Sequence, residues 1–153
     1  MTTSPHLFEL YLTPLDEARF REIVTDSTLG SDAESELYLP FWEGGQDWRT
    51  TVIKVLESSR GFKAEHFPQS GEQDWMVRAG ILSAGYPNFA PAYLEKIGQT
   101  LFQALLSPDQ LVGQVFQSAL RKAEEAGVTL HLRLKFAADS AKRSRLAAYP
   151  WEL

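Results

Sequence analysis

The sequence of 153 residues contains no cysteine. A disulfide bond, a thiolate metal site and a cysteine nucleophile are therefore excluded within it. Long apolar segments are also missing: the longest uncharged run covers 79–94, is too short to cross a bilayer, and contains two glycines and two prolines. The N-terminus lacks the basic and apolar regions of a signal peptide. These absences predict a soluble, cytoplasmic protein without a membrane-spanning segment.

The composition is that of a folded domain, and its charges are unevenly distributed. With 44% hydrophobic and 23% charged residues, the chain has enough apolar surface to form a core. The formal charge of −5 divides into −8 over 1–48, zero over 49–127 and +3 over 128–153. An acidic N-terminal part argues against general nucleic-acid binding. The basic C-terminal part instead fits an acidic protein surface, including the acidic segment of the same chain or of a neighbouring copy.

Three segments near the N-terminus have the composition of β-strands. Residues 7–13, 19–25 and 34–41 are rich in β-forming residues. Pro14 ends the first segment, and turn-forming residues over 26–32 separate the second from the third. We expect an antiparallel meander with one polar face and one apolar face, and the apolar face needs a cover.

Four helices are predicted next. Asp47 is a plausible N-cap for a helix that ends near Gly61, and a second short helix covers about 72–83. The two prolines in 85–91 predict a loop there. The third helix starts near Pro91 and has an apolar stripe, and the fourth ends at Gly127 after a predicted capping box, Ser107-Pro108-Asp109-Gln110. The stripe of the third helix consists of Leu94, Ile97, Leu101 and Leu105.

Residues 128–136 form the clearest strand pattern in the sequence. Apolar and polar residues alternate along the whole segment, which is the period of a strand with two different faces. One face would carry Val128, Leu130, Leu132, Leu134 and Phe136, and the other Thr129, His131, Arg133 and Lys135. The fold class is therefore α+β, with an N-terminal meander, about four helices and a C-terminal strand. We expect a first domain over 1–127 and the start of a second over 128–153.

The C-terminal third of the sequence resembles a known family. Two amphipathic helices lead to a strand containing Leu132-Arg133-Leu134, and the chain then reaches Pro150-Trp151-Glu152-Leu153. This order resembles the region before and at the start of bacterial CHAT domains, which are caspase-like proteases. Residues 92–153 carry most of the resemblance. The segment that ends in Leu39-Pro40-Phe41 loosely resembles the small domain often found upstream of a CHAT domain.

The resemblance implies a non-catalytic role for these residues. In CHAT proteases the catalytic histidine and cysteine lie downstream of the Pro-Trp-Glu motif, so we expect this chain to be the N-terminal part of a longer protein. Trp151 would then anchor the start of the caspase-like sheet, and Glu152 would need a buried partner. The implied function is regulation or interaction in front of a caspase-like domain in a bacterial signalling or defence system. The alternative is a stand-alone module for ligand binding or oligomerisation.

No residue pattern in the sequence indicates catalysis, a cofactor or a metal. His131 lacks a nucleophile and an orienting acid, and His6 and His66 lack the spacing of paired metal ligands. We therefore expect no catalytic, cofactor-binding or metal-binding residues. A protein partner, the downstream domain or a second copy is the expected contact. The candidate interface residues are the basic cluster and two aromatic residues of the loop: Arg133, Lys135, Lys142, Arg143, Arg145, Tyr86 and Phe89.

Overall fold

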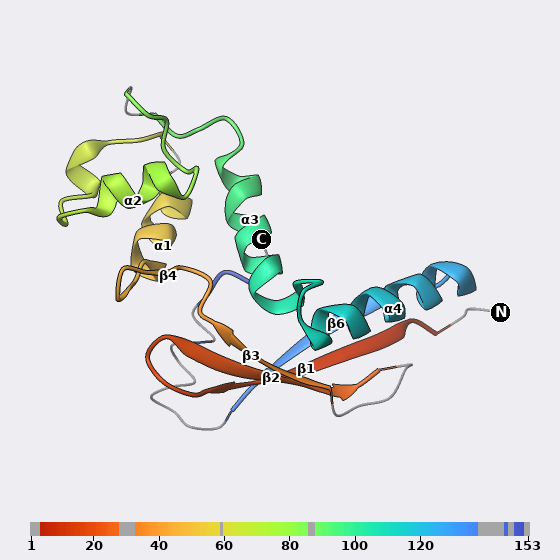
Figure 1. The fold of residues 1–153 in the computed structure, drawn as a ribbon. Helices are drawn as coiled ribbons and strands as arrows, with labels where there is room; N and C mark the ends of the chain where they lie inside the picture. Colours follow the sequence, from red (N-terminus) through yellow and green to blue (C-terminus); the bar gives the residue numbers. More distant parts are fainter. Residues whose placement is uncertain are drawn as a thin grey trace. The chain divides into compact units, whose positions relative to one another are not determined.

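The computed structural model describes residues 4–27, 33–58, 60–85, 88–137, 146 and 149–151. The fold is α+β, as predicted, and the described residues form four α-helices, a four-stranded mixed sheet and a two-stranded sheet. They divide into two compact units (Figure 1). The sheet unit comprises 1–39 and 103–149, and the helical unit comprises 40–102 and 150–153.

The sheet unit contains the predicted meander and one further strand. Strands β1 (His6–Pro14), β2 (Arg19–Asp26) and β3 (Glu34–Tyr38) pair antiparallel in sequence order. Strand β6 (Leu130–Phe136) joins parallel to β1, which gives the strand order β3-β2-β1-β6. The segment 128–136, expected to open a second domain, thus lies in the same sheet and the same unit as the meander. The structure therefore does not divide the chain after residue 127.

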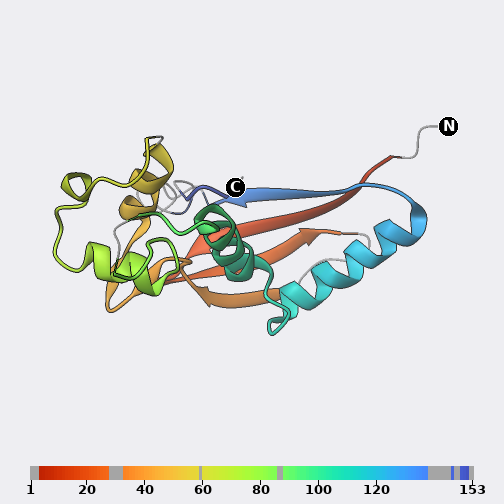
Figure 2. The same ribbon diagram turned by 90° about the horizontal axis from the view of Figure 1, so that it is seen from above.

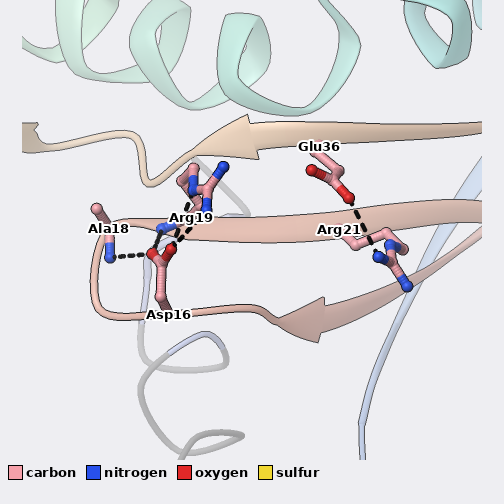
Figure 3. Close-up of polar contacts among 5 residues, drawn as sticks. All are labelled: Asp16, Ala18, Arg19, Arg21 and Glu36. Atoms are coloured by element: carbon pink, nitrogen blue, oxygen red, sulfur yellow. Dashed lines mark hydrogen bonds and ion pairs between the residues drawn. The ribbon is translucent and has the colours of Figure 1, made fainter.

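The turn between β1 and β2 is held by one carboxylate. Asp16 accepts hydrogen bonds from the backbone N–H groups of Ala18 and Arg19, at 2.9 and 2.8 Å, and pairs with the Arg19 guanidinium (Figure 3). The bond from Ala18, followed by the one from the Arg19 side chain, lowers the pKa of Asp16. An Asp side chain that bonds its own following backbone is a common way to fix a tight turn.

Helix α4 (Leu111–Ala126) covers one face of the sheet (Figures 1 and 2). Phe8 on β1 meets Phe116 on α4 edge to face, with 5.2 Å between ring centroids. Leu10 and Leu12 alternate with Glu9 and Tyr11, so they share the face of Phe8 and are fully buried. This covered face holds the core of the sheet unit, and the face that carries Glu9 is called the opposite face below.

The predicted C-terminal end of α4 is confirmed, and the predicted N-terminal cap is wrong. Gly127 has a φ of 66° and forms the left-handed C-cap, as predicted. The capping box is wrong: the helix starts at Leu111, after an extended Gln110, and the Ser107 hydroxyl accepts a hydrogen bond from the N–H of Asp109 instead. The backbone at Ser107 turns against Gly113 of α4 instead of opening the helix. The approach is close: a Cβ added to Gly113 would lie 1.8 Å from the carbonyl oxygen of Ser107.

The helical unit begins with a short hairpin and continues through the predicted helices. Its elements are β4 (Trp42–Glu43), β5 (Gln46–Asp47), α1 (Arg49–Glu57), the short 3₁₀ helix η1 (Ala64–His66) and α2 (Glu72–Arg78). Helix α3 (Tyr93–Leu106) follows and runs past the boundary of the unit in the sequence. Trp48, not Asp47, is the N-cap residue of α1. The Asp47 carboxylate accepts the N–H of Arg49 at 3.0 Å, so it still satisfies one donor of the first turn.

Aromatic rings form the core of the helical unit. The rings of Trp48 and Trp75 are stacked, with centroids 5.4 Å apart, and Phe41 meets Trp75 edge to face. All three residues are buried. Such pairs add stability beyond the burial of their area.

Candidate interaction surface

Strand β6 lies at one edge of the four-stranded sheet and β3 lies at the other (Figure 2). Among the residues that the structure describes, no strand pairs with the outer side of β6. An unpaired edge presents free N–H and C=O groups to any extended chain that approaches. This edge is the candidate functional site.

The backbone groups that point outward can be identified from the parallel ladder. His6 donates to the carbonyl of Thr129 at 2.9 Å, and Ala137 donates to the carbonyl of Leu12 at 2.9 Å. In a parallel pair, every second residue of a strand bonds to its neighbour on a given side. The odd-numbered residues of β6 therefore bond to β1. The N–H and C=O groups of Leu130, Leu132 and Leu134 point away from it.

The leucines of β6 are less buried than the sequence pattern suggested. They lie on the face that α4 covers, because Leu132 is aligned with Phe8 of β1 and Leu134 with Leu10. Leu132 nevertheless remains 42% exposed. A shallow hollow of about 580 Å³ follows the strand and is lined by Leu7, Leu130, His131, Leu132, Arg133 and Leu134. A hollow that follows consecutive residues of a strand suits an extended segment.

The opposite face of β6 is basic. Arg133 and Lys135 each lie 3.3 Å from a carboxylate oxygen of Glu9 on β1, and both bases remain more than half exposed. The hydroxyl of Thr25, 2.9 Å from Glu9, is the main cause of a lowered pKa of the Glu9 carboxyl, and Lys135 and Arg133 lower it further. One carboxylate is shared by two cations, so this strand keeps an excess of positive charge at the sheet edge.

The remaining candidate residues are not gathered at this edge in the described structure. Phe89 belongs to the helical unit, where its ring packs against Phe62 and Tyr93 with centroids 5.9 and 4.8 Å away. Trp151 is half-buried, and its proposed anchoring role stays a prediction. Five candidates lie outside the described residues, namely Tyr86, Lys142, Arg143, Arg145 and Glu152.

The helical unit has a hollow of its own. It measures about 190 Å³, and its lining includes the aromatic residues Phe41, Trp42 and Trp75 together with Glu43 and Lys96. Glu43 already pairs with Arg78 at 2.8 Å. Pockets for small ligands usually measure about 300–1,000 Å³. This hollow is too small to be the preferred candidate.

The described residues contain no group of three or more His, Asp or Glu side chains arranged to hold a metal ion. In the part of the chain that the structure describes, no helix is both long and apolar enough to cross a membrane.

The chain was also compared with known proteins. No family model, no curated protein and no solved structure matches it. The relation to CHAT proteins therefore stays a prediction from the residues quoted above.

Proposed function

We propose that this chain is a non-catalytic interaction domain that binds an extended protein segment along the outer edge of β6. The observation that carries the proposal is the exposed Leu132 on a strand whose outer backbone groups are unpaired among the described residues. A bound strand would satisfy the backbone groups of three alternate leucines and cover their side chains. This is strand addition, in which backbone bonds supply affinity and side-chain positions supply specificity.

The charge of β6 sets the kind of segment that fits. Arg133 and Lys135 share Glu9 and remain mostly exposed, so a segment with acidic residues at alternate positions would be favoured. A basic segment would be repelled. Nucleic acid fits less well, because β3 of the same sheet carries the exposed acids Glu34 and Glu36.

We further propose that the domain precedes a caspase-like CHAT domain in a bacterial cytoplasmic protein. The support is the order of Leu132-Arg133-Leu134 and Pro150-Trp151-Glu152-Leu153 after two helices. In this setting the domain would regulate the protease or connect it to a protein partner. The reading frame after Leu153 tests this part: it should encode a histidine followed by a cysteine, and a frame without them contradicts it.

Amide hydrogen exchange tests the binding edge directly. We expect fast exchange at the amides of Leu130, Leu132 and Leu134 in the free chain, since they point to solvent. Adding an extended peptide with acidic residues at alternate positions should protect these three amides more than those of Arg133 and Lys135, which already bond to β1. Unchanged exchange at all three leucines would contradict β6 as the binding edge.

A further inference from the structure

The second edge strand, β3, has the properties that β6 requires of a partner. Val24 donates to the carbonyl of Ala33 and Leu39 donates to that of Ala18, both at 2.8 Å. Antiparallel pairing alternates in the same way, so the N–H and C=O groups of Glu34, Glu36 and Tyr38 point away from β2. These three side chains are exposed and lie on the opposite face.

The chain already shows how β3 pairs with a basic strand. On β2, Arg21 is aligned with Glu36 of β3, and their side chains form an ion pair at 3.1 Å (Figure 3). Strand β6 presents Arg133 and Lys135 on the same face of the sheet as Arg21. One edge of the sheet therefore carries two alternating bases, and the other edge carries two alternating acids.

We propose that β6 of one copy pairs with β3 of a second copy, so that the sheet continues from chain to chain. This inference rests on the proposed function, because it names the segment that occupies the β6 edge. Strands β3 and β6 both run in the direction of β1, so copies related by translation along the sheet meet in parallel.

The hydrogen-bond pattern allows a register that also brings compatible side chains together. With Leu132 aligned with Ser35 of the second copy, the outward groups of Leu132 meet those of Glu34 and Glu36. Arg133 then lies beside Glu36, and His131 lies beside Glu34. On the covered face, Leu134 lies beside Leu37. This alignment therefore places one base beside one acid on the opposite face and two leucines together on the covered face.

A symmetric contact between two β6 strands is disfavoured. It would place Arg133 and Lys135 close to the same residues of the other copy, and like charges on adjacent strands repel. The contact between β6 and β3 is instead head-to-tail and leaves a free edge at each end, so more copies can add. A single strand pair buries less than the roughly 1,200 Å² of a stable interface, so weak association is expected.

The test is sedimentation velocity of the full chain over a concentration series. We expect the mean sedimentation coefficient to rise with concentration at low salt. In about 1 M salt, where the Debye length is about 3 Å, the rise should be much smaller. The double variants E34K/E36K and R133E/K135E should each lose self-association, and an equimolar mixture of the two should regain it. E124K/E125K is the matched control for E34K/E36K, because it makes the same charge change on exposed residues of α4.

Two substitutions of Leu132 test the β6 edge without changing β3. L132P removes an outward N–H without breaking a bond to β1, and proline is tolerated on edge strands. L132T removes the leucine side chain but keeps the N–H. We expect L132P to abolish association and L132T to weaken it. Circular dichroism of each variant confirms that the fold is kept.

The outcomes distinguish the two proposals. Restored association in the mixture supports pairing of β6 with β3. A chain that stays monomeric at every concentration overturns the second copy as partner. Loss with L132P but not with E34K/E36K also overturns it, while the β6 edge remains a binding site. Association that persists in L132P and in both charge variants overturns the inference and counts against the proposed function.

Discussion

Glu22 on β2 lies directly opposite Ser35 on β3, and both side chains share the face of the sheet that α4 covers. The Ser35 hydroxyl accepts a hydrogen bond from the N–H of Val112 in the first turn of α4, at 3.3 Å. Glu22 is fully buried, and neither of its carboxyl oxygens has a hydrogen-bond partner among the described residues. Burial raises the pKa of Glu22 to about 9, so the carboxyl is protonated at neutral pH.

The buried acid predicts that stability falls as the pH rises. Between the ordinary pKa of 4.5 and the folded value of about 9, the unfolded chain releases the proton of Glu22 and the folded chain keeps it. The free energy of unfolding should therefore decrease by up to about 1.4 kcal/mol per pH unit over this range, and level off above it. Urea denaturation across the range measures the slope.

The substitution Glu22→Gln isolates this contribution. Glutamine has nearly the same shape and does not ionise, so the variant should lose the part of the slope that Glu22 causes. It should be more stable than the original chain at high pH. Glu9→Gln is a useful comparison: because the pKa of Glu9 is lowered, the slope that Glu9 contributes is confined to acidic pH, where its stabilisation is lost as the pH falls. Equal slopes for Glu22→Gln and the original chain would show that Glu22 does not hold its proton.

Ser35 predicts a smaller effect at the start of α4. The change Ser35→Ala leaves the N–H of Val112 without its acceptor and should cost about 1 kcal/mol of unfolding free energy. Thr100→Ala is the control, since the Thr100 hydroxyl only bonds back to the carbonyl of Lys96 on an exposed part of α3. Chemical denaturation should show no loss of unfolding free energy for the control. Equal losses for the two variants would contradict a stabilising hydrogen bond from Val112 to Ser35.

Adding a single methyl group at Gly113 should cause a larger loss of unfolding free energy. In Gly113→Ala the new Cβ would overlap the backbone of Ser107, so α4 or the preceding turn must move. We expect a cost of several kcal/mol. Gly127→Ala should cost only about 1 kcal/mol, because its site is open and only its φ of 66° is unfavourable. Melting temperatures of the two variants should differ in this order; the reverse order would contradict the close approach.

The helical unit contains a second fully buried glutamate, which, unlike Glu22, has hydrogen-bond and ion-pair partners. Glu72 accepts hydrogen bonds from the Thr51 hydroxyl at 2.9 Å and the N–H of Gln69 at 3.2 Å, and it pairs with the ammonium group of Lys54. Lys54→Met removes the cation and should cost about 2 kcal/mol, since Lys54 itself is partly exposed.

The exposed pair of Arg78 and Glu43 in the same unit is the comparison for Lys54. Arg78→Met should cost less than about 1 kcal/mol, because both partners are about half exposed to solvent. The double variant Lys54→Met with Glu72→Leu should recover part of the loss of the single one. Denaturation midpoints that fail to separate Lys54→Met from Arg78→Met would argue against a buried, charge-dependent contact.

Local sequence patterns predicted most of the elements, because their signals are short-range. The alternation over 128–136 identified a strand, and Gly127 marked the end of the preceding helix. The pairing of that strand was not predictable in the same way, since β6 joins a strand at the other end of the chain. Alternation assigns residues to two faces, but it does not say that the strand lies at an edge, where Leu132 stays exposed.

Two further features show where the sequence signal existed and where it did not. Glu22 alternates with Phe20 and Val24, so its place on an apolar face was readable from the pattern, whereas its lack of a partner required the packed structure. The capping box at Ser107 matched in sequence and failed in space, because the backbone there turns against Gly113. Residue spacing carries no information about such a contact.

The parallel pairing of β1 with β6 also affects how the chain is made. More than a hundred residues separate the two strands, and α4 comes just before the second. At about 5–20 residues per second, a ribosome needs roughly 5–25 s to travel between them. Throughout that interval Phe8, Leu10 and Leu12 lack their cover, and β1 has an unpaired side. Uncovered apolar side chains and an unpaired strand edge favour aggregation, so slower synthesis across the helical unit would prolong this exposure.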